Sequence, residues 1–348
     1  MFDLNKILRE NIKNLVPYSS ARDEFKGEAS IFLDANENAY GSPLEQNFNR
    51  YPDPLQIKLK EKISKIKGVP VKNIFLGNGS DEVIDILYRA FCNPGNDNVI
   101  LTPPTYGMFE VSANINDVGV KKAPLTADFH LYTEGISEAV DNNTKLIFIC
   151  SPNNPTGNSP GREDIEFILN NFDGIVVIDE AYINFSKQKS FTTELAEYPN
   201  LVVMQTLSKA WGMAGLRVGM AFASEEIIAV FNKIKPPYNI NSSSQELAMK
   251  ALDNIDQVNN WIKEIVNERE KLAKSLADFP FVQKVFSSDA NFLLTKTNEP
   301  KKLYNYLVTK KIIVRDRSNV ALCEGCLRIT VGTKEENRKL IEALNQYK

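Results

Sequence analysis

Histidine is the scarcest chemically versatile residue in this sequence of 348 residues, because His130 is its only example. Hydrolase triads that use a histidine as general base would all have to pass through that one side chain. It lies in Asp128-Phe129-His130-Leu131, a context typical of a loop or the edge of a strand. Zinc sites built on several histidines are excluded. If the chain is an enzyme, we expect its acid–base chemistry to use lysine, tyrosine or a carboxylate.

Cysteine, long apolar runs and an excess of charge of one sign are also scarce. Four cysteines indicate a reducing compartment rather than a disulfide framework. No apolar run approaches the ~20 residues of a membrane span, and Asp3, Lys6, Arg9 and Glu10 interrupt the first apolar residues, which argues against a signal peptide. The formal net charge is only −3, so no global field attracts nucleic acid. We therefore expect a cytoplasmic protein that binds neither membrane nor nucleic acid.

The order of apolar patterns predicts an α/β fold. Continuous apolar runs, typical of buried parallel strands, lie at 146–150, 175–178 and 201–204. Apolar residues with helical spacing lie at 55–66, 81–91 and 162–170. This alternation predicts a mostly parallel sheet flanked by helices.

The length corresponds to roughly two domains of ordinary size. An N-terminal arm (1–28) with a short amphipathic helix over 4–15 is expected to precede the large domain (29–236). After Pro236-Pro237, we expect one long helix over 244–276 and then strand-like runs between helices. These features predict a smaller α+β domain over 237–348.

Polar residues follow the three apolar runs directly, where open α/β sheets bind ligands. The clusters are Ser151-Pro152-Asn153-Asn154-Pro155-Thr156-Gly157, then Asp179-Glu180-Ala181-Tyr182, then Thr206-Leu207-Ser208-Lys209. Each also has an ordinary explanation, since Asn and Pro dominate turns, an acid can cap a helix and lysine is usually exposed. In the functional interpretation, Asn154 is rigidly aimed and Asp179 faces a cationic nitrogen of a ligand.

Two further features indicate an anionic ligand. Arg217 follows Lys209 by eight positions among small and apolar residues, and two cations in such a segment require an anion between them. The segment 77–82 (Gly-Asn-Gly-Ser-Asp-Glu) joins a strand to a helix as a phosphate cradle would, although an ordinary helix cap explains it equally well. Taken together, a phosphate cradle, an acid for a ring nitrogen and a reactive lysine match pyridoxal 5′-phosphate.

With these motifs the chain resembles the fold-type I, class-II pyridoxal phosphate-dependent aminotransferases. It is most similar to the histidinol-phosphate aminotransferase family, through the segments 14–18, 33–38, 50–53, 103–108, 314–317 and 325–333. The matching segments span nearly the whole chain in the expected order. The family usually has a proline soon after Asn-Glu-Asn, where this sequence has Ala39-Tyr40, so that loop is expected to differ in shape.

The resemblance implies a role for each residue of a cofactor site. Lys209 would hold the cofactor as a Schiff base and move a proton between the substrate α-carbon and the cofactor's C4′. Asp179 would pair with the pyridine nitrogen, Asn154 and Tyr182 with the 3-oxygen, and Tyr106 would stack on the ring. Residues implied at the phosphate are Ser80, Asp81, Ser208 and Arg217. Thr206 would lie on the far side of the cofactor.

The resemblance also implies partners and substrates. Tyr51 would reach the phosphate of a neighbouring subunit, which implies a homodimer with shared active sites. L-Histidinol phosphate and 2-oxoglutarate would give imidazole-acetol phosphate and L-glutamate by a ping-pong route. Substrate-binding residues would be Tyr18, Asn36, Arg315 and Arg328. An arginine pairs with phosphate or carboxylate alike, so one site would serve both half-reactions; the additional Arg317 has no assigned role.

Other interpretations remain open at this stage. An aromatic amino-acid aminotransferase would use similar pockets, and a decarboxylase of a phosphorylated amino acid such as threonine phosphate would share the lysine, the aspartate and the phosphate site. A regulator that binds the cofactor would need a DNA-binding domain, for which the first ~30 residues leave no room. A nicotinamide dehydrogenase is disfavoured, because the glycine-rich strand–helix turn of this sequence lacks the spacing that binds a dinucleotide. Cys323-x-x-Cys326 resembles a redox or zinc pair, but Cys326 stands where the family commonly has cysteine, so we expect no metal.

Overall fold

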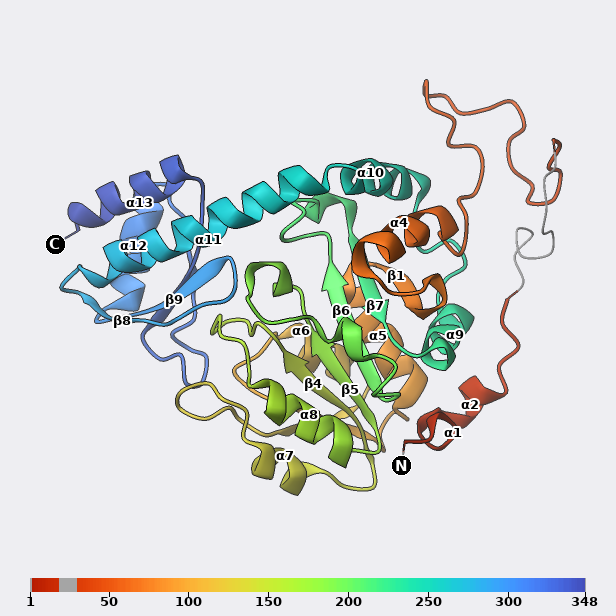
Figure 1. Ribbon diagram of the computed structural model, residues 1–348, viewed down its shortest axis with the longest axis horizontal. Coiled ribbons are helices and arrows are strands. Elements are labelled where there is room, and N and C mark those ends of the chain that lie inside the picture. The colour runs from red at the N-terminus through yellow and green to blue at the C-terminus, as the bar shows by residue number, and fades with distance from the viewer. Residues whose placement is uncertain (1, 19–29, 348) are drawn as a thin grey trace.

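The computed structural model describes residues 2–18 and 30–347. A seven-stranded sheet in the order β1-β7-β6-β5-β4-β2-β3 forms the centre of the larger part (Figure 1). Its strands are β1 (Ile74–Asn78), β2 (Asn98–Leu101), β3 (Gly119–Lys122), β4 (Thr144–Cys150), β5 (Ile175–Asp179), β6 (Leu201–Thr206) and β7 (Val218–Phe222). Neighbours from β3 to β6 pair in parallel, and only β7 runs antiparallel to both of its neighbours. This confirms the predicted fold class.

Helices cover both faces of this sheet. They are α4 (Ile57–Lys67), α5 (Ser80–Phe91), α6 (Met108–Ile115), α7 (Thr133–Ala139), α8 (Arg162–Asn171) and α9 (Glu225–Ile234). Alternate residues of one strand enter different cores: Leu146 and Phe148 of β4 join the core with α5, α6 and α9, and Ile147 and Ile149 join the core with α4 and α8. All four side chains are fully buried. Burial on both faces explains why these strands are continuous apolar runs in the sequence.

A second, antiparallel sheet in the order β10-β11-β9-β8 forms the smaller part. Its strands are β8 (Val282–Val285), β9 (Phe292–Thr297), β10 (Arg315–Asp316) and β11 (Cys326–Thr330), with helices α12 (Pro300–Thr309) and α13 (Lys334–Asn345). Helix α11 (Ile255–Ala277) extends from the larger part to this sheet (Figure 1).

Two helix predictions were wrong in extent. The helix expected over 244–276 is two helices, α10 (Ser242–Leu252) and α11, because Asn254 between them bonds its side chain back to the carbonyl of Lys250 at 3.0 Å. The helix expected over 4–15 is α1 (Leu4–Ile7) and α2 (Glu10–Lys13). The amide of Arg9 between them donates to the carbonyl of Ala90 at the end of α5 instead of continuing the helix.

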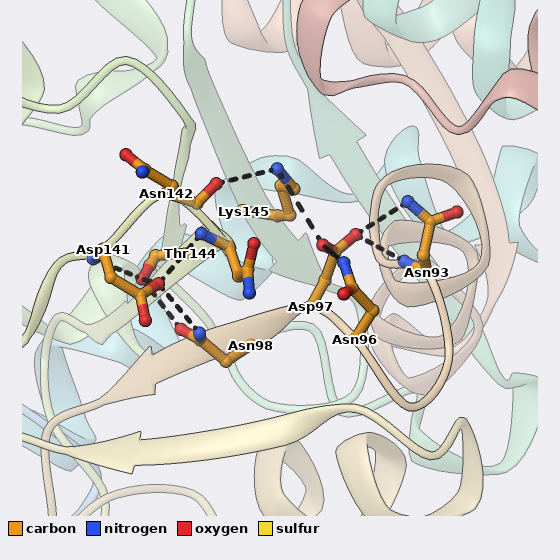
Figure 2. A network of polar contacts seen from close by, with 9 residues as sticks. Asn93, Asn96, Asp97, Asn98, Asp141, Asn142, Thr144 and Lys145 are labelled. Carbon is orange, nitrogen blue, oxygen red and sulfur yellow. Dashed lines mark hydrogen bonds and ion pairs between the residues drawn. The ribbon is translucent and has the colours of Figure 1, made fainter.

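Polar side chains fix the starts of β2 and β4, at the edge of the sheet where both strands begin (Figure 2). The buried carboxylate of Asp97 accepts hydrogen bonds from the amide and side chain of Asn93, at 2.6 and 2.9 Å. Asp141 accepts from Asn98 at 3.0 Å and forms an ion pair with Lys121, and these contacts hold the pKa of its carboxyl well below the usual value. This network anchors the strands whose other ends form the site. None of the helices in the described part of the chain has the length and apolarity to cross a membrane.

Candidate active site

A pocket of about 390 Å³ lies where β4, β5 and β6 end. Most of the predicted site residues line it together: Ser80, Asp81, Tyr106, Asn154, Asp179, Tyr182, Thr206, Ser208, Lys209, Arg217, Arg315 and Arg328. They come from segments far apart in the sequence and from both sheets. The carboxyl ends of parallel strands meet at one edge, so residues that follow different strands converge there.

An anion cradle lies between β1 and α5. The backbone of Gly79 has a φ of +77°, and a Cβ at that position would collide with the guanidinium of Arg217. A Cβ on Gly219, on the neighbouring β7, would collide with the backbone of Ser80. The glycines thus leave the first N–H groups of α5 accessible, at the helix end that favours anions. Arg217 lies beside them and forms an ion pair with Asp81 at 3.2 Å.

Two hydroxyls lie at the end of β6, next to this cradle in the pocket. The hydroxyl of Thr206 donates to that of Ser208 at 2.9 Å and accepts from the amide of Ser208 at 3.0 Å. This local turn places the Ser208 hydroxyl at the pocket surface rather than on the strand. A phosphate group therefore fits the charge and the hydrogen-bond donors present here.

Asp179 is the buried acid of the pocket. It is the last residue of β5, its side chain is 4% exposed, and one carboxylate oxygen accepts from the amide of Ala181 at 3.0 Å. Burial raises the pKa of this carboxyl from 3.8 to about 6. No side-chain donor among the described residues bonds to it. A buried carboxylate in this state fits a ligand that brings its own cationic N–H.

Lys209 is the nucleophile candidate. Burial, together with the positive charges of Arg328 and Arg217, lowers the pKa of its amine, and Asp179 and Asp81 oppose that effect. Its Nζ atom lies 5.6 Å from the centre of the Tyr182 ring. A lowered pKa increases the share of neutral amine, the form that attacks a carbonyl carbon.

Asn154 and Tyr106 are held by other members of the pocket. Arg328 donates to Oδ1 of Asn154, which leaves the Nδ2 donor of this amide for a ligand. The Tyr106 hydroxyl donates to Asp81 at 3.2 Å, and its ring packs edge-on against Phe109 with ring centres 5.5 Å apart. Both side chains are therefore oriented before any ligand binds.

Sequence reasoning missed some of the residues that line the pocket. Cys150, Ala181 and Ala214 were not among the candidates, and Arg317 had no role. Cys150 is the last residue of β4 and pairs with Asp179 across the strands, so its place at a strand end was the available signal. The pKa of its thiol is raised by burial.

Three predicted residues do not line this pocket. Tyr18 is 75% exposed and lines a separate pocket beside α2, together with Arg9. Asn36 is exposed on a loop, and Tyr51 stacks on Tyr238 with ring centres 4.4 Å apart. Their roles stay predictions.

The two cysteines of the Cys-x-x-Cys segment belong to the hydrophobic core. Cys323 and Cys326 are free and buried, and burial raises the pKa of their thiols to about 12 and about 11. Over residues 2–18 and 30–347, no group of three or more His, Cys, Asp or Glu side chains suits a metal ion.

Comparison with known proteins defines the family. Residues 31–344 match the family model of aminotransferase class I and II. The chain is 55% identical to the histidinol-phosphate aminotransferase of Cytophaga hutchinsonii over 99% of both chains, and 55% identical to that of Parabacteroides distasonis over both full lengths. The structure of the histidinol-phosphate aminotransferase from Clostridium acetobutylicum superimposes with a TM-score of 0.79 and 26% identity, over 85% of this chain and 90% of that one. The chain therefore belongs to the class I and II aminotransferases and, within them, to the histidinol-phosphate aminotransferase family, whose members depend on pyridoxal 5′-phosphate.

Proposed function

We propose that this pocket transfers the amino group of L-histidinol phosphate to 2-oxoglutarate in two successive half-reactions. The products are imidazole-acetol phosphate and L-glutamate, and the reaction belongs to histidine biosynthesis. The observation that carries the proposal is the buried carboxylate of Asp179, without a side-chain donor of its own, in one pocket with Lys209 and a glycine-lined anion cradle. The full-length identity to relatives named for this substrate supports it.

The residues present fit pyridoxal 5′-phosphate. The first amides of α5, the Ser208 hydroxyl and Arg217 would hold its phosphate, and the carboxylate of Asp179 would accept a hydrogen bond from its protonated ring nitrogen. When bound, the cofactor supplies an aldehyde carbon that takes up the amino group and a ring that withdraws electrons from the substrate α-carbon. An ionised Asp179 favours the protonated ring nitrogen and so favours this withdrawal.

Lys209 would carry the proton in both half-reactions. Its amine, once free, accepts the proton from the substrate α-carbon and delivers it to C4′ of the cofactor, and the second half-reaction reverses these moves. The lowered pKa of Lys209 suits this work because it increases the share of neutral amine, the form that can accept a proton. The Nδ2 group of Asn154 and the hydroxyl of Tyr182 would hold the 3-oxygen, while Tyr106 and Thr206 would flank the ring.

Arginines would bind the substrate anions. Arg328 reaches the pocket from β11, its guanidinium 5.2 Å from the centre of the Phe292 ring, and Arg315 lies opposite it on β10. A guanidinium pairs with the phosphate of one substrate and a carboxylate of the other. Tyr18 and Asn36 would complete this end of the site.

We further propose that the active enzyme is a cytoplasmic homodimer in which Tyr51 reaches the phosphate site of the other subunit. Segment 30–56 has no helix or strand and runs outside the main body in Figure 1. It exposes large apolar side chains, with Leu33 at 86% and Tyr40 fully exposed. Such side chains on one segment are typical of a surface that a second chain covers.

The function is tested by measuring glutamate formation from 2-oxoglutarate with three amine donors, L-histidinol phosphate, L-phenylalanine and threonine phosphate. We expect the highest kcat/KM with L-histidinol phosphate. An equal or higher value with L-phenylalanine would indicate an aromatic amino-acid aminotransferase. Release of carbon dioxide from threonine phosphate, without glutamate, would indicate a decarboxylase.

A further inference from the structure

Arg317 lines the pocket but has no role in the proposed reaction as described so far by the other residues. On the paired strands β10 and β11, Arg315 stands directly opposite Arg328. The amide of Arg317 donates to the carbonyl of Cys326 at 2.9 Å, which extends the pairing by one position. Side chains alternate along a strand, so Arg317 emerges on the same face as Arg315 and Arg328. All three guanidinium groups line the pocket.

Within the described part of the chain, no carboxylate forms an ion pair with Arg317. The acids that line the pocket are Asp81, which pairs with Arg217, and Asp179, which faces the lysine. The Nε atom of Arg317 is buried and has no hydrogen-bond partner among the described residues. Burial and the two neighbouring arginines lower the pKa of its guanidinium. The three arginines therefore leave an excess of positive charge on this side of the pocket, which favours an anionic ligand.

Arg317 also borders a second pocket of about 410 Å³. Tyr106, Asn154 and Arg315 line both pockets, so the two cavities adjoin. The walls of the side pocket are largely apolar, formed by residues that include Pro104, Met108, Pro155 and Val320. Arg317 therefore stands between the cofactor pocket and a side pocket with largely apolar walls.

One site must bind both substrates of the proposed reaction, which are alike near the reacting carbon and differ at the opposite end. Each brings an anion near the reacting carbon, a phosphate in one and a carboxylate in the other. At the opposite end, however, L-histidinol phosphate has an imidazole ring and 2-oxoglutarate has a second carboxylate. A planar guanidinium accommodates both, because it stacks on aromatic faces and pairs with carboxylates through two parallel hydrogen bonds.

We propose that Arg317 is a specificity-determining residue that contacts this variable end of each substrate. It stacks on the imidazole ring at the mouth of the side pocket in one half-reaction and pairs with the distal carboxylate in the other. Arg328 and Arg315 then bind the anion near the reacting carbon, the phosphate of one substrate and the carboxylate of the other. This inference rests on the proposed function.

The test measures the two half-reactions separately on the holoenzyme, from the change in cofactor absorbance. We expect Arg317→Gln to raise the concentration of 2-oxoglutarate that gives half the maximal rate by at least about tenfold. Its reaction with 2-oxobutyrate, which lacks the distal carboxylate, should stay within about twofold, since that end makes no ion pair. Arg317→Lys should restore 2-oxoglutarate binding through its charge but not the binding of L-histidinol phosphate, because an ammonium has no flat face. Arg338→Gln, on the exposed face of α13, is the matched control.

Several results would overturn the role of Arg317. An unchanged response to both substrates in Arg317→Gln would do so. A second contradicting result is a loss of L-histidinol phosphate binding alone in Arg317→Gln that Arg317→Lys restores. That pattern would mean that this residue binds the substrate phosphate. L-Glutamate at saturating concentration loads the amino group even in variants that bind it more weakly, so the 2-oxoglutarate comparison holds even if the wild-type enzyme rejects L-histidinol phosphate. That rejection would contradict the proposed function instead. Thermal melting and the cofactor spectrum identify any variant that fails to fold.

Discussion

The buried acid Asp179 should destabilise the cofactor-free fold, and replacing it with Asn should reveal by how much. Its carboxyl has a pKa of about 6 in the folded chain against 3.8 as the ordinary value. The folded state therefore holds the proton more tightly, and the unfolding free energy falls as the pH rises from below 3.8 to above about 6. At 1.36 kcal/mol for each pH unit, the fall amounts to about 3 kcal/mol. Roughly 1.4 kcal/mol of it lies between about pH 5 and pH 8.

The assay is urea unfolding of the cofactor-free wild type and of Asp179→Asn across this pH range. Carboxylates remote from residue 179 titrate equally in both proteins, so the difference between the two unfolding free energies reports residue 179 together with the charges coupled to it, Asp81, Glu180 and Lys209. We expect the unfolding free energy of the Asn variant to rise relative to that of the wild type as the pH rises. Its transaminase activity should collapse, because the ring nitrogen of the cofactor no longer faces a carboxylate. A difference that stays constant with pH, or that shifts in favour of the wild type, would refute the desolvation of Asp179.

Further predictions concern the chemistry, the substrate site and the core. Lys209→Ala should abolish turnover yet still bind pyridoxal 5′-phosphate. Mass spectra should show that borohydride no longer attaches the cofactor covalently to the chain. Near-normal turnover would contradict the assigned role of Lys209. Arg328→Ala should weaken the binding of both L-histidinol phosphate and glutamate in half-reaction titrations. A loss of glutamate binding alone would indicate that another group binds the phosphate. Phe148→Ala should lower the unfolding free energy by about 3–5 kcal/mol, because this fully buried ring stacks on Phe109 and Tyr88 at 4.7 and 5.5 Å. A change below about 1 kcal/mol in chemical denaturation would contradict that packing.

The strands that the sequence predicted best are those buried on both faces. The strands β4, β5 and β6 read as continuous apolar runs because each of their faces meets helices. β3 was not predicted, since it lies at the sheet edge with Lys121 and Lys122 on it and lacks such a run. β7 was hidden in a glycine-rich stretch, where Gly219 is required by the close approach of the Ser80 backbone.

The cofactor end of the pocket was predictable because its residues follow strands directly. Asp179 and Lys209 could be placed at one sheet edge from the strand pattern alone. Arg317 could not, because its position depends on pairing with Cys326 in a second sheet far along the chain. The break between α10 and α11 likewise depends on how the Asn254 side chain bonds to the backbone, which periodicity does not reveal.

The most direct test of the proposed function is a single-turnover titration of the holoenzyme, followed by cofactor absorbance without any oxo acid. L-Histidinol phosphate, L-phenylalanine and threonine phosphate are added separately. We predict that L-histidinol phosphate converts the cofactor stoichiometrically to its aminated form at the lowest concentration of the three. Equal or better conversion with L-phenylalanine, or no cofactor absorbance even after pyridoxal 5′-phosphate is added, would contradict it.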